Sequence, residues 1–182
     1  ALAPKLSADQ QGTLYEGHDY RAHGETNDIV FLMTYEWGWS GGPPMAVSPI
    51  DQVRAVLDYA VTEIPRDKIM MGIPLYGYDW TLPYVPGGQW ARSISPQQAI
   101  ELALRYNTNI EYDTVSQAPF FNYADEQGRQ HIVWFEDARS IQAKFNLVKE
   151  MGIRGCFYWV LGRSFPQNWL LIEDNFEVRK LI

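Results

Sequence analysis

The chain's 182 residues correspond to one domain, or to one domain with a small insertion. Its 15 basic and 22 acidic residues give a net charge of −7 without a run of Lys or Arg, which excludes the basic surface that nucleic-acid binding requires. No apolar run reaches about 18 residues, so we expect no membrane-spanning helix and no membrane partner.

The first strong structural signal follows a short strand-like segment at 1–5 and a polar, glycine-containing stretch at 6–27. A strand is predicted over residues 29–35, because five apolar residues run without a polar break, as in a strand buried on both faces of a helix-covered parallel sheet. This strand ends in the hydroxyl of Tyr35 and the carboxylate of Glu36. Because ligands meet parallel α/β folds at the carboxyl ends of strands, we expect a sugar-binding surface there.

The loop at 37–44 contains two Trp residues among glycines and prolines. Aromatic residues make up 14% of the whole chain, with seven Trp and eleven Tyr. This excess favours stacking on the C–H faces of sugar rings, and an aromatic-rich core is the alternative.

A helix and a second strand follow the loop. Ser48 is predicted to cap the helix, with Pro49 at its first position and Pro65 at its end. The apolar run at 68–76 predicts a second buried strand. Strand, helix and strand in this order predict a βαβ unit with parallel pairing.

Residues 81–136 interrupt this alternation. Ser95 is predicted to begin a helix that runs to about Tyr106, with Gln98 completing a capping box. Three short strands are then predicted at 110–112, 120–123 and 131–135, the last two joined by a hairpin turn. We interpret this region as a small α+β insertion.

The alternation resumes after the insertion. Asp137 is predicted to cap a helix over 138–151, which Gly152 ends. A third buried strand is predicted at 155–161, with Trp159 near its carboxyl end, and a last helix begins near residue 166. The adjacent acids at 136 and 137 could be mistaken for a catalytic pair, but we interpret them as part of a helix cap.

Several segments together resemble the later strands of a family 18 glycoside hydrolase. The strongest are 33–37, 72–80 and the strand that carries Trp159, and they occur in the family's order. The similarity is greatest to the spore-cortex-lytic branch, whose members cleave beside N-acetylglucosamine in peptidoglycan, and 135–140 and 166–169 support this branch. The resemblance covers nearly the whole chain.

The resemblance implies an α/β fold that is part of a (β/α)8 TIM barrel with a small α+β insertion. The strands here resemble strands five to eight, with the segment at 1–5 as the remnant of the fifth. Residues 1–80 and 137–182 would form the half-barrel, and residues 81–136 the insertion.

The family's acid lies in an Asp-x-x-Asp-x-Asp-x-Glu motif, and this pattern is absent from the 182 residues. The resemblance implies substrate-assisted retaining hydrolysis of β-linked N-acetylglucosamine in peptidoglycan or chitin, without a metal or an organic cofactor. We therefore expect the C-terminal part of an enzyme, inactive alone, whose partners are a glycan and the missing N-terminal half. An extracellular, cell-wall or spore location follows from the resemblance alone.

Two other hypotheses remain open. One is a non-catalytic glycan-binding protein. The other is an open half-barrel that pairs with a second copy, because exposed parallel edges at 1–5 and 155–161 would be costly in a monomer.

The resemblance assigns supporting catalytic roles to two residues. Tyr35 would hold the acetamido oxygen of the substrate, and its alternative role is a strand-end tyrosine bonded to backbone. Glu36 stands where many relatives have Asp and would steady the acetamido N–H or the oxazolinium ion, with a solvated loop acid as the alternative.

The substrate-binding candidates are mostly aromatic. Trp159 would form the floor beneath the reacting sugar and Met33 would line the pocket floor, with core packing as the alternative for both. The other candidates for the cleft are Trp37 and Trp39, which would stack on sugars, and Tyr76, Tyr78 and Trp80, which could instead cover the insertion.

Overall fold

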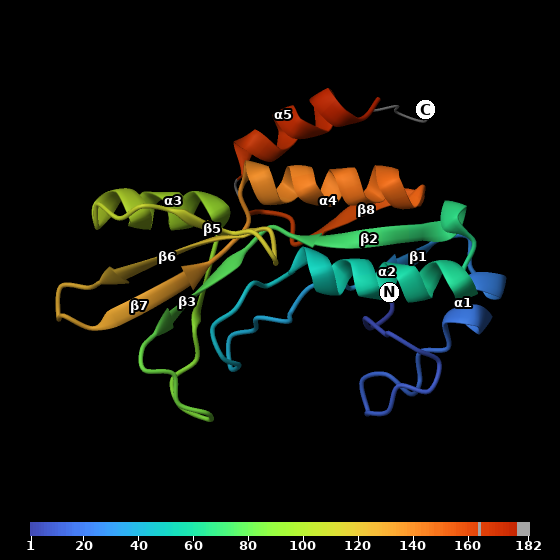
Figure 1. Ribbon diagram of the computed structural model, residues 1–182, viewed down its shortest axis with the longest axis horizontal. Helices are drawn as coiled ribbons and strands as arrows, with labels where there is room; N and C mark the ends of the chain where they lie inside the picture. The colour runs from blue at the N-terminus through green and yellow to red at the C-terminus, as the bar shows by residue number, and fades with distance from the viewer. Residues whose placement is uncertain (164, 178–182) are drawn as a thin grey trace.

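The computed structural model describes residues 1–163 and 165–177. Two sheets divide the molecule (Figure 1). The strands are β1 (Val30–Leu32), β2 (Ile69–Pro74), β3 (Gly77–Thr81), β4 (Arg92–Ile94), β5 (Glu111–Asp113), β6 (Ala118–Ala124), β7 (Gln130–Trp134) and β8 (Gly155–Trp159). The helices are α1 (Tyr20–Thr26), α2 (Ile50–Glu63), α3 (Pro96–Arg105), α4 (Ala138–Met151) and α5 (Pro166–Asn175), with a 3-10 turn at Arg66–Lys68.

The first sheet is parallel, in the order β1-β2-β8. Leu2 adds a parallel bridge to Leu32, so the expected strand at 1–5 is present as a single bridge. Helices α2 and α4 pack on this sheet, and α5 packs on α4 (Figure 1). The parallel segments therefore follow one another in chain order across the sheet, as a βαβ succession requires.

One face of β1 is left uncovered, so the prediction that this strand is buried on both faces was wrong, whereas β2 is buried at nearly every position. On β1, Val30 and Leu32 are buried while the intervening Phe31 is 37% exposed. The Phe31 ring stacks on Phe157 of β8 at a centroid distance of 4.5 Å. The apolar run thus packs on the helices with one face and presents aromatic rings on the other. The strand is also shorter than predicted, because regular pairing stops at Leu32.

The second sheet is antiparallel, in the order β4-β3-β7-β6-β5, with α3 beside it (Figure 1). The three strands expected at 110–112, 120–123 and 131–135 correspond to β5, β6 and β7. Strands β3 and β4 were not predicted. The chain passes from the parallel sheet to the antiparallel sheet between Pro74 and Gly77. Strand β3 therefore belongs to the second sheet, although residues 77–80 were predicted to lie with the parallel strands. The division into domains stays a prediction.

The helix starts show where local signals suffice. Ser95 accepts a hydrogen bond from the Gln98 N–H at 3.2 Å, and the Gln98 side chain accepts from the Ser95 N–H at 2.8 Å, which confirms the capping box. Asp137 caps α4 in the same way, and Gly152 ends it with a φ of +60°. The predicted cap at Ser48 was wrong, because its buried hydroxyl donates instead to the Thr34 carbonyl at 2.7 Å.

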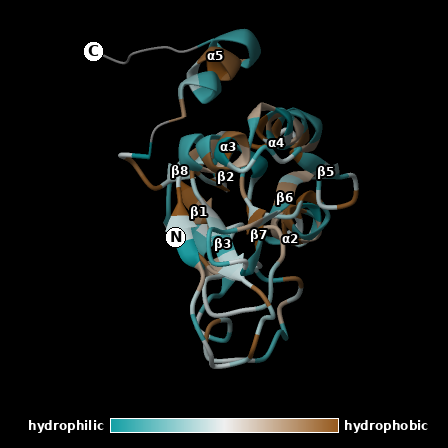
Figure 2. Ribbon diagram, turned by 90° about the vertical axis from the view of Figure 1, so that its left-hand side faces the viewer, coloured by the Kyte–Doolittle hydropathy of each residue, from teal (hydrophilic) through white to brown (hydrophobic). Residues whose placement is uncertain are grey.

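Separate apolar cores stabilise the two sheets. One lies between the parallel sheet and helices α2 and α4, and the other between α3 and the antiparallel sheet. In Figure 2 both α3 and α4 alternate between hydrophilic and hydrophobic colouring, as amphipathic helices do. None of the helices within the described ranges has both the length and the apolar character needed to cross a bilayer.

Candidate active site

The carboxylate of Glu36 is held by two phenols. Its Oε1 accepts a hydrogen bond from the Tyr78 hydroxyl at 2.9 Å and another from the Tyr76 hydroxyl. Burial, followed by the hydrogen bond to Glu36, raises the pKa of Tyr76, and burial, followed by the charge of Glu36, raises the pKa of Tyr78. Both phenols therefore stay protonated and act as donors.

The backbone at Glu36 supports a functional role. Its φ is +71°, in the left-handed region that residues other than glycine rarely adopt. Such conformations cost on the order of 1–3 kcal/mol and cluster at active sites and ligand clamps. The hydrogen bonds from Tyr76 and Tyr78 hold the side chain that this backbone turn presents.

Tyr35 lies next to this carboxylate with its ring half-buried. The ring meets Phe157 edge-on at a centroid distance of 6.4 Å, and it packs above Gly72, where a Cβ would come within 2.7 Å of the Tyr35 Cε1. Within the described ranges no group forms a hydrogen bond with the Tyr35 hydroxyl, so the expected alternative of a bond to backbone is not seen. Burial, followed by the charge of Glu36, raises the pKa of Tyr35, so the hydroxyl is a protonated donor.

Trp159 ends β8 and is 53% exposed. It lines a hollow of about 360 Å³ together with Glu36, Tyr76, Tyr78, Ser93, Val160 and Arg163. The structure therefore brings together four of the predicted site residues at the carboxyl ends of the parallel strands. An exposed indole here provides a flat apolar face for a ligand and is not part of the core.

Four predicted binding residues lie outside this hollow, and three of them are half-buried or buried. Trp37 is half-buried and packs against the core of the parallel sheet. Trp80 is 1% exposed, and its Nε1 donates to the Gly42 carbonyl at 2.9 Å, so it supports the loop at 37–44 from beneath. Met33 is half-buried, and its N–H donates to the Leu2 carbonyl at 2.9 Å.

The loop at 37–44 also presents Trp39, whose indole is 42% exposed. It meets the exposed indole of Trp90 at a centroid distance of 5.9 Å and an interplanar angle of 86°. Both indoles are partly exposed, and stacking of Trp39 on a sugar stays a prediction.

Sequence analysis missed Ser93, Val160 and Arg163. Val160 lies at the carboxyl end of the strand predicted at 155–161 and Arg163 follows it closely, so the rule that ligands meet strand ends could have identified both. Ser93 lies on β4, a three-residue strand with no apolar pattern, and carries no comparable signal.

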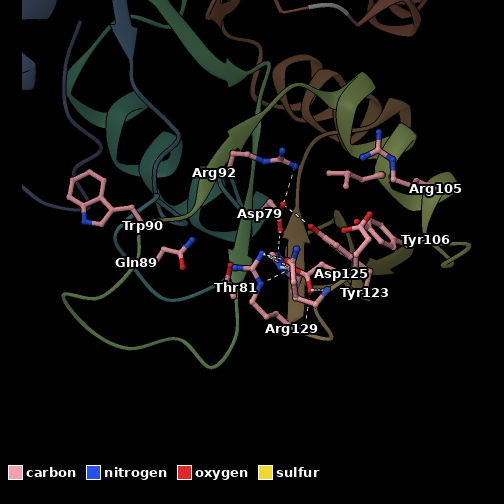
Figure 3. A pocket seen from close by; sticks show the side chains of 14 residues that line it. Asp79, Thr81, Gln89, Trp90, Arg92, Arg105, Tyr106, Tyr123, Asp125 and Arg129 are labelled. Atoms are coloured by element: carbon pink, nitrogen blue, oxygen red, sulfur yellow. Dashed lines mark hydrogen bonds and ion pairs between the residues drawn. The ribbon is translucent and has the colours of Figure 1, made fainter.

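The pleat of β3 separates its side chains between two sites. Tyr78 and Trp80 point to one face, and Asp79 points to the other. The Asp79 carboxylate accepts from His131 Nδ1 at 2.9 Å, from Tyr123 at 2.9 Å and from Arg92 at 3.2 Å. Figure 3 shows Asp79, Arg92 and Tyr123 in the hollow that Asp79 lines. These contacts satisfy the Asp79 carboxylate within the antiparallel sheet.

The acids at 136 and 137 are structural. Glu136 is 1% exposed and pairs with the buried Lys144 at 2.9 and 3.0 Å, while Asp137 caps α4. No substrate could reach Glu136 without unfolding this junction. Within the described residues, no group of three His, Cys, Asp or Glu side chains is arranged to hold a metal ion.

A fixed carboxylate, an available phenol and an exposed indole suit recognition of a sugar that carries a polar substituent. The sequence matches the model of glycosyl hydrolases family 18 over residues 2–163. The chain belongs to glycosyl hydrolases family 18. Within this family it is 67% identical, over 180 residues, to the cortical fragment-lytic enzyme of Bacillus subtilis (strain 168), covering 99% of this chain and 42% of that relative.

Solved structures of family 18 enzymes superpose on this chain. The spore cortex-lytic enzyme of Bacillus megaterium QM B1551 superposes with a TM-score of 0.95 at 66% identity, covering 100% of this chain and 41% of that one. A chitinase from Chromobacterium violaceum ATCC 12472 superposes with a TM-score of 0.86 at 30% identity, covering 98% and 55%. The chain thus spans about two fifths of the length of its cortex-lytic relatives and matches their C-terminal portion. The resemblance predicted from sequence is confirmed, and family 18 neighbours imply a TIM-barrel-like α/β fold.

Proposed function

We propose that this chain forms the acetamido-binding side of the active site of a glycosidase that hydrolyses β-linked N-acetylglucosamine in peptidoglycan. The observation that carries the proposal is the Tyr35 hydroxyl. It is a protonated donor that the described fold does not use, and it lies beside Glu36 at the strand ends that also present Trp159. Peptidoglycan is preferred to chitin because the most similar relatives are named for lysis of the spore cortex, which also favours a spore or cell-wall location.

The chemistry is substrate-assisted. The acetamido carbonyl oxygen attacks the anomeric carbon as the glycosidic C–O bond breaks, and a glutamic acid outside these residues protonates the leaving oxygen. Tyr35 donates to the acetamido group and orients it, while Glu36 faces its N–H and the positive charge of the oxazolinium ion. Water then opens this ion, with overall retention.

The remaining scaffold is supplied by other residues in this proposal. Leu2, β1, β2 and β8 would be strands five to eight of the barrel, and the open face with Phe31 and Phe157 would meet the preceding half. An apolar face of this kind is costly to leave in water.

The test compares two proteins. One is the 182-residue chain, and the other is an extended protein in which this chain follows the N-terminal part of the Bacillus subtilis relative that lies outside the match. We expect reducing sugar to be released from cortex peptidoglycan by the extended protein only. Release by the short chain would refute the proposed division of the site.

The absent acid pattern keeps a second function open, a glycan-binding protein without turnover. Binding of N-acetylglucosamine oligosaccharides by the extended protein with no hydrolysis would favour it. The open face of the parallel sheet also permits pairing with a second copy, and a strictly monomeric short chain in light scattering would count against that pairing.

A further inference from the structure

Arg163 contributes a positive charge to the candidate active site. It lines the same hollow as Glu36, Tyr78 and Trp159. Its Nη2 donates to the Ser93 hydroxyl at 3.3 Å, and no carboxylate in the described part of the chain forms an ion pair with it. Burial raises the pKa of Tyr78, and the charge of Arg163 acts in the opposite direction, which places the guanidinium within electrostatic reach of that phenol.

The hollow around Trp159 continues past Arg163 into a polar groove. Arg163 also lines an adjoining hollow of about 300 Å³, whose other walls are Ser95, Gln97, Gln98, Glu101 and Gly162. A further hollow shares Ser93 with the Trp159 hollow and shares Gln98 and Glu101 with the adjoining hollow. Its other lining residues are Arg92, Ile94, Leu102 and Arg105. We name the continuous surface of these last two hollows, beyond the Trp159 hollow, the α3 groove. It contains hydroxyl, amide and charged groups but no aromatic ring, so it is unsuited to stacking on a sugar and suited to a hydrogen-bonding substituent.

The charges of the α3 groove place an anion at Arg163. Arg92 is already paired with Asp79, and Arg105 lines neither the Trp159 hollow nor the hollow next to it. Glu101, which accepts from Gln97 at 3.1 Å, repels negative groups farther along. The guanidinium beside Ser93 is therefore the position where a carboxylate gains a charge-assisted hydrogen bond and a hydroxyl partner.

Peptidoglycan and chitin differ in the chemistry that this groove can recognise. Every second sugar of peptidoglycan carries a lactyl ether whose carboxyl group is free or amide-linked to a carboxylate-bearing peptide, whereas chitin is neutral. We propose that Arg163 and the α3 groove bind the carboxylate-bearing substituent of a muramic acid unit next to the N-acetylglucosamine held over Trp159. This inference rests on the proposed function and deepens it, because it assigns the preference for peptidoglycan to one side chain.

The test measures kcat/KM of the extended protein on three glycans of equal length. These are a chitooligosaccharide, an N-acetylglucosamine–muramic acid oligosaccharide with free lactyl carboxylates, and the same oligosaccharide bearing peptides. Arg163→Gln removes the charge, Arg163→Lys keeps it without the planar fork, and Arg21→Gln is the control. Arg21 is an exposed arginine that pairs with Glu63, away from this site.

We expect Arg163→Gln to lower kcat/KM on one or both muramic acid glycans roughly 10- to 100-fold, with the chitooligosaccharide within about twofold of the unsubstituted protein. Arg163→Lys should recover part of the loss, and Arg21→Gln should change nothing. The muramic acid glycan that loses more identifies the source of the carboxylate, lactyl or peptide.

Equal losses on all three glycans, or no loss on any, would overturn the assignment of Arg163. Turnover of the glycans by the unsubstituted extended protein keeps the proposed function intact in either case. If the unsubstituted protein cleaves none of the three, the proposed function fails, and this inference fails with it.

Discussion

The hydroxyl of Tyr78 lies 2.9 Å from Oε1 of Glu36, although 42 positions separate the two residues in the chain. Glu36 follows β1, the first strand of the parallel sheet, and Tyr78 lies on β3 of the antiparallel sheet. The antiparallel sheet therefore contributes to the site, because its strand β3 supplies a donor that fixes the orientation of the candidate catalytic carboxylate.

Replacing Tyr78 by Phe should lower the kcat of the extended protein, with little effect on its free energy of unfolding. Loss of one hydrogen bond to a charged acceptor costs about 1.5–3 kcal/mol where the acceptor's orientation matters, which corresponds to a roughly tenfold or greater loss of kcat in the extended protein. Tyr106→Phe is the control, because Tyr106 also interacts with a glutamate, Glu126, which raises its pKa, but at the C-terminal end of α3. Similar losses for both variants would show that Tyr78 acts only through the fold.

Replacing Tyr35 by Phe tests the hydroxyl that carries the proposed function. The ring keeps its packing against Phe157, and only a donor without a partner in the described fold is lost. Removing a donor that stabilises charge in a transition state typically costs about 10²–10³ in kcat, so turnover should fall far more than glycan affinity. An equal loss in both quantities, measured by steady-state kinetics and calorimetric titration, would assign Tyr35 a structural role.

Gly72 makes room for the Tyr35 ring. A Cβ at this position would lie 2.7 Å from the Leu32 carbonyl oxygen and 2.7 Å from Tyr35 Cε1. Gly72→Ala should therefore destabilise the extended protein by about 1–3 kcal/mol and displace Tyr35. The kcat should fall even under conditions where the variant is fully folded. Gly17→Ala is the control, because nothing lies within 4 Å of a Cβ there. Full activity of Gly72→Ala would show that the Tyr35 ring can move without consequence.

The features that the sequence predicted best are the helix caps, which depend on residues close together in the chain. Ser95, Gln98 and Asp137 form the expected caps because each partner lies within a few residues of the cap. Ser48 carries the same local signal, but a distant carbonyl, Thr34, takes its hydroxyl. Propensity was overridden there by tertiary contact, which a local pattern does not contain.

The candidate site was predictable where it follows strand ends and not where it depends on pairing across the fold. Tyr35 and Trp159 end apolar runs that periodicity identifies. The contact of Tyr76 and Tyr78 with Glu36 depends on the change of sheet after Pro74, and the runs at 69–74 and 77–81 are continuous in sequence. Arg163 and Ser93 meet only because β4 pairs with β3, a strand pair that no apolar alternation marks.

The buried pair of Glu136 and Lys144 fixes the junction between the antiparallel sheet and α4. The two side chains are 1% and 0% exposed and form two contacts, at 2.9 and 3.0 Å. Lys144→Met should lower the free energy of unfolding of the extended protein by about 3–5 kcal/mol, because it leaves a buried carboxylate without its partner. Lys149→Met is the control on the same helix, where an exposed lysine contacts Asn175, and its effect should stay within about 0.5 kcal/mol.

The pH dependence of the Lys144→Met protein distinguishes loss of the ion pair from loss of packing. Burial raises the pKa of Glu136, and the ammonium of Lys144 opposes that effect in the unsubstituted protein. In the variant the folded state keeps the proton at pH values where the unfolded chain, with a glutamate pKa of about 4.3, has lost it. The free energy of unfolding should therefore be highest below that pH and fall as the pH rises, more steeply than in the unsubstituted protein. Urea unfolding between pH 4 and 8 measures this slope, and Lys144→Met combined with Glu136→Leu should abolish the added dependence, because the buried carboxyl is gone. A slope that persists in the double variant would place its origin at another group.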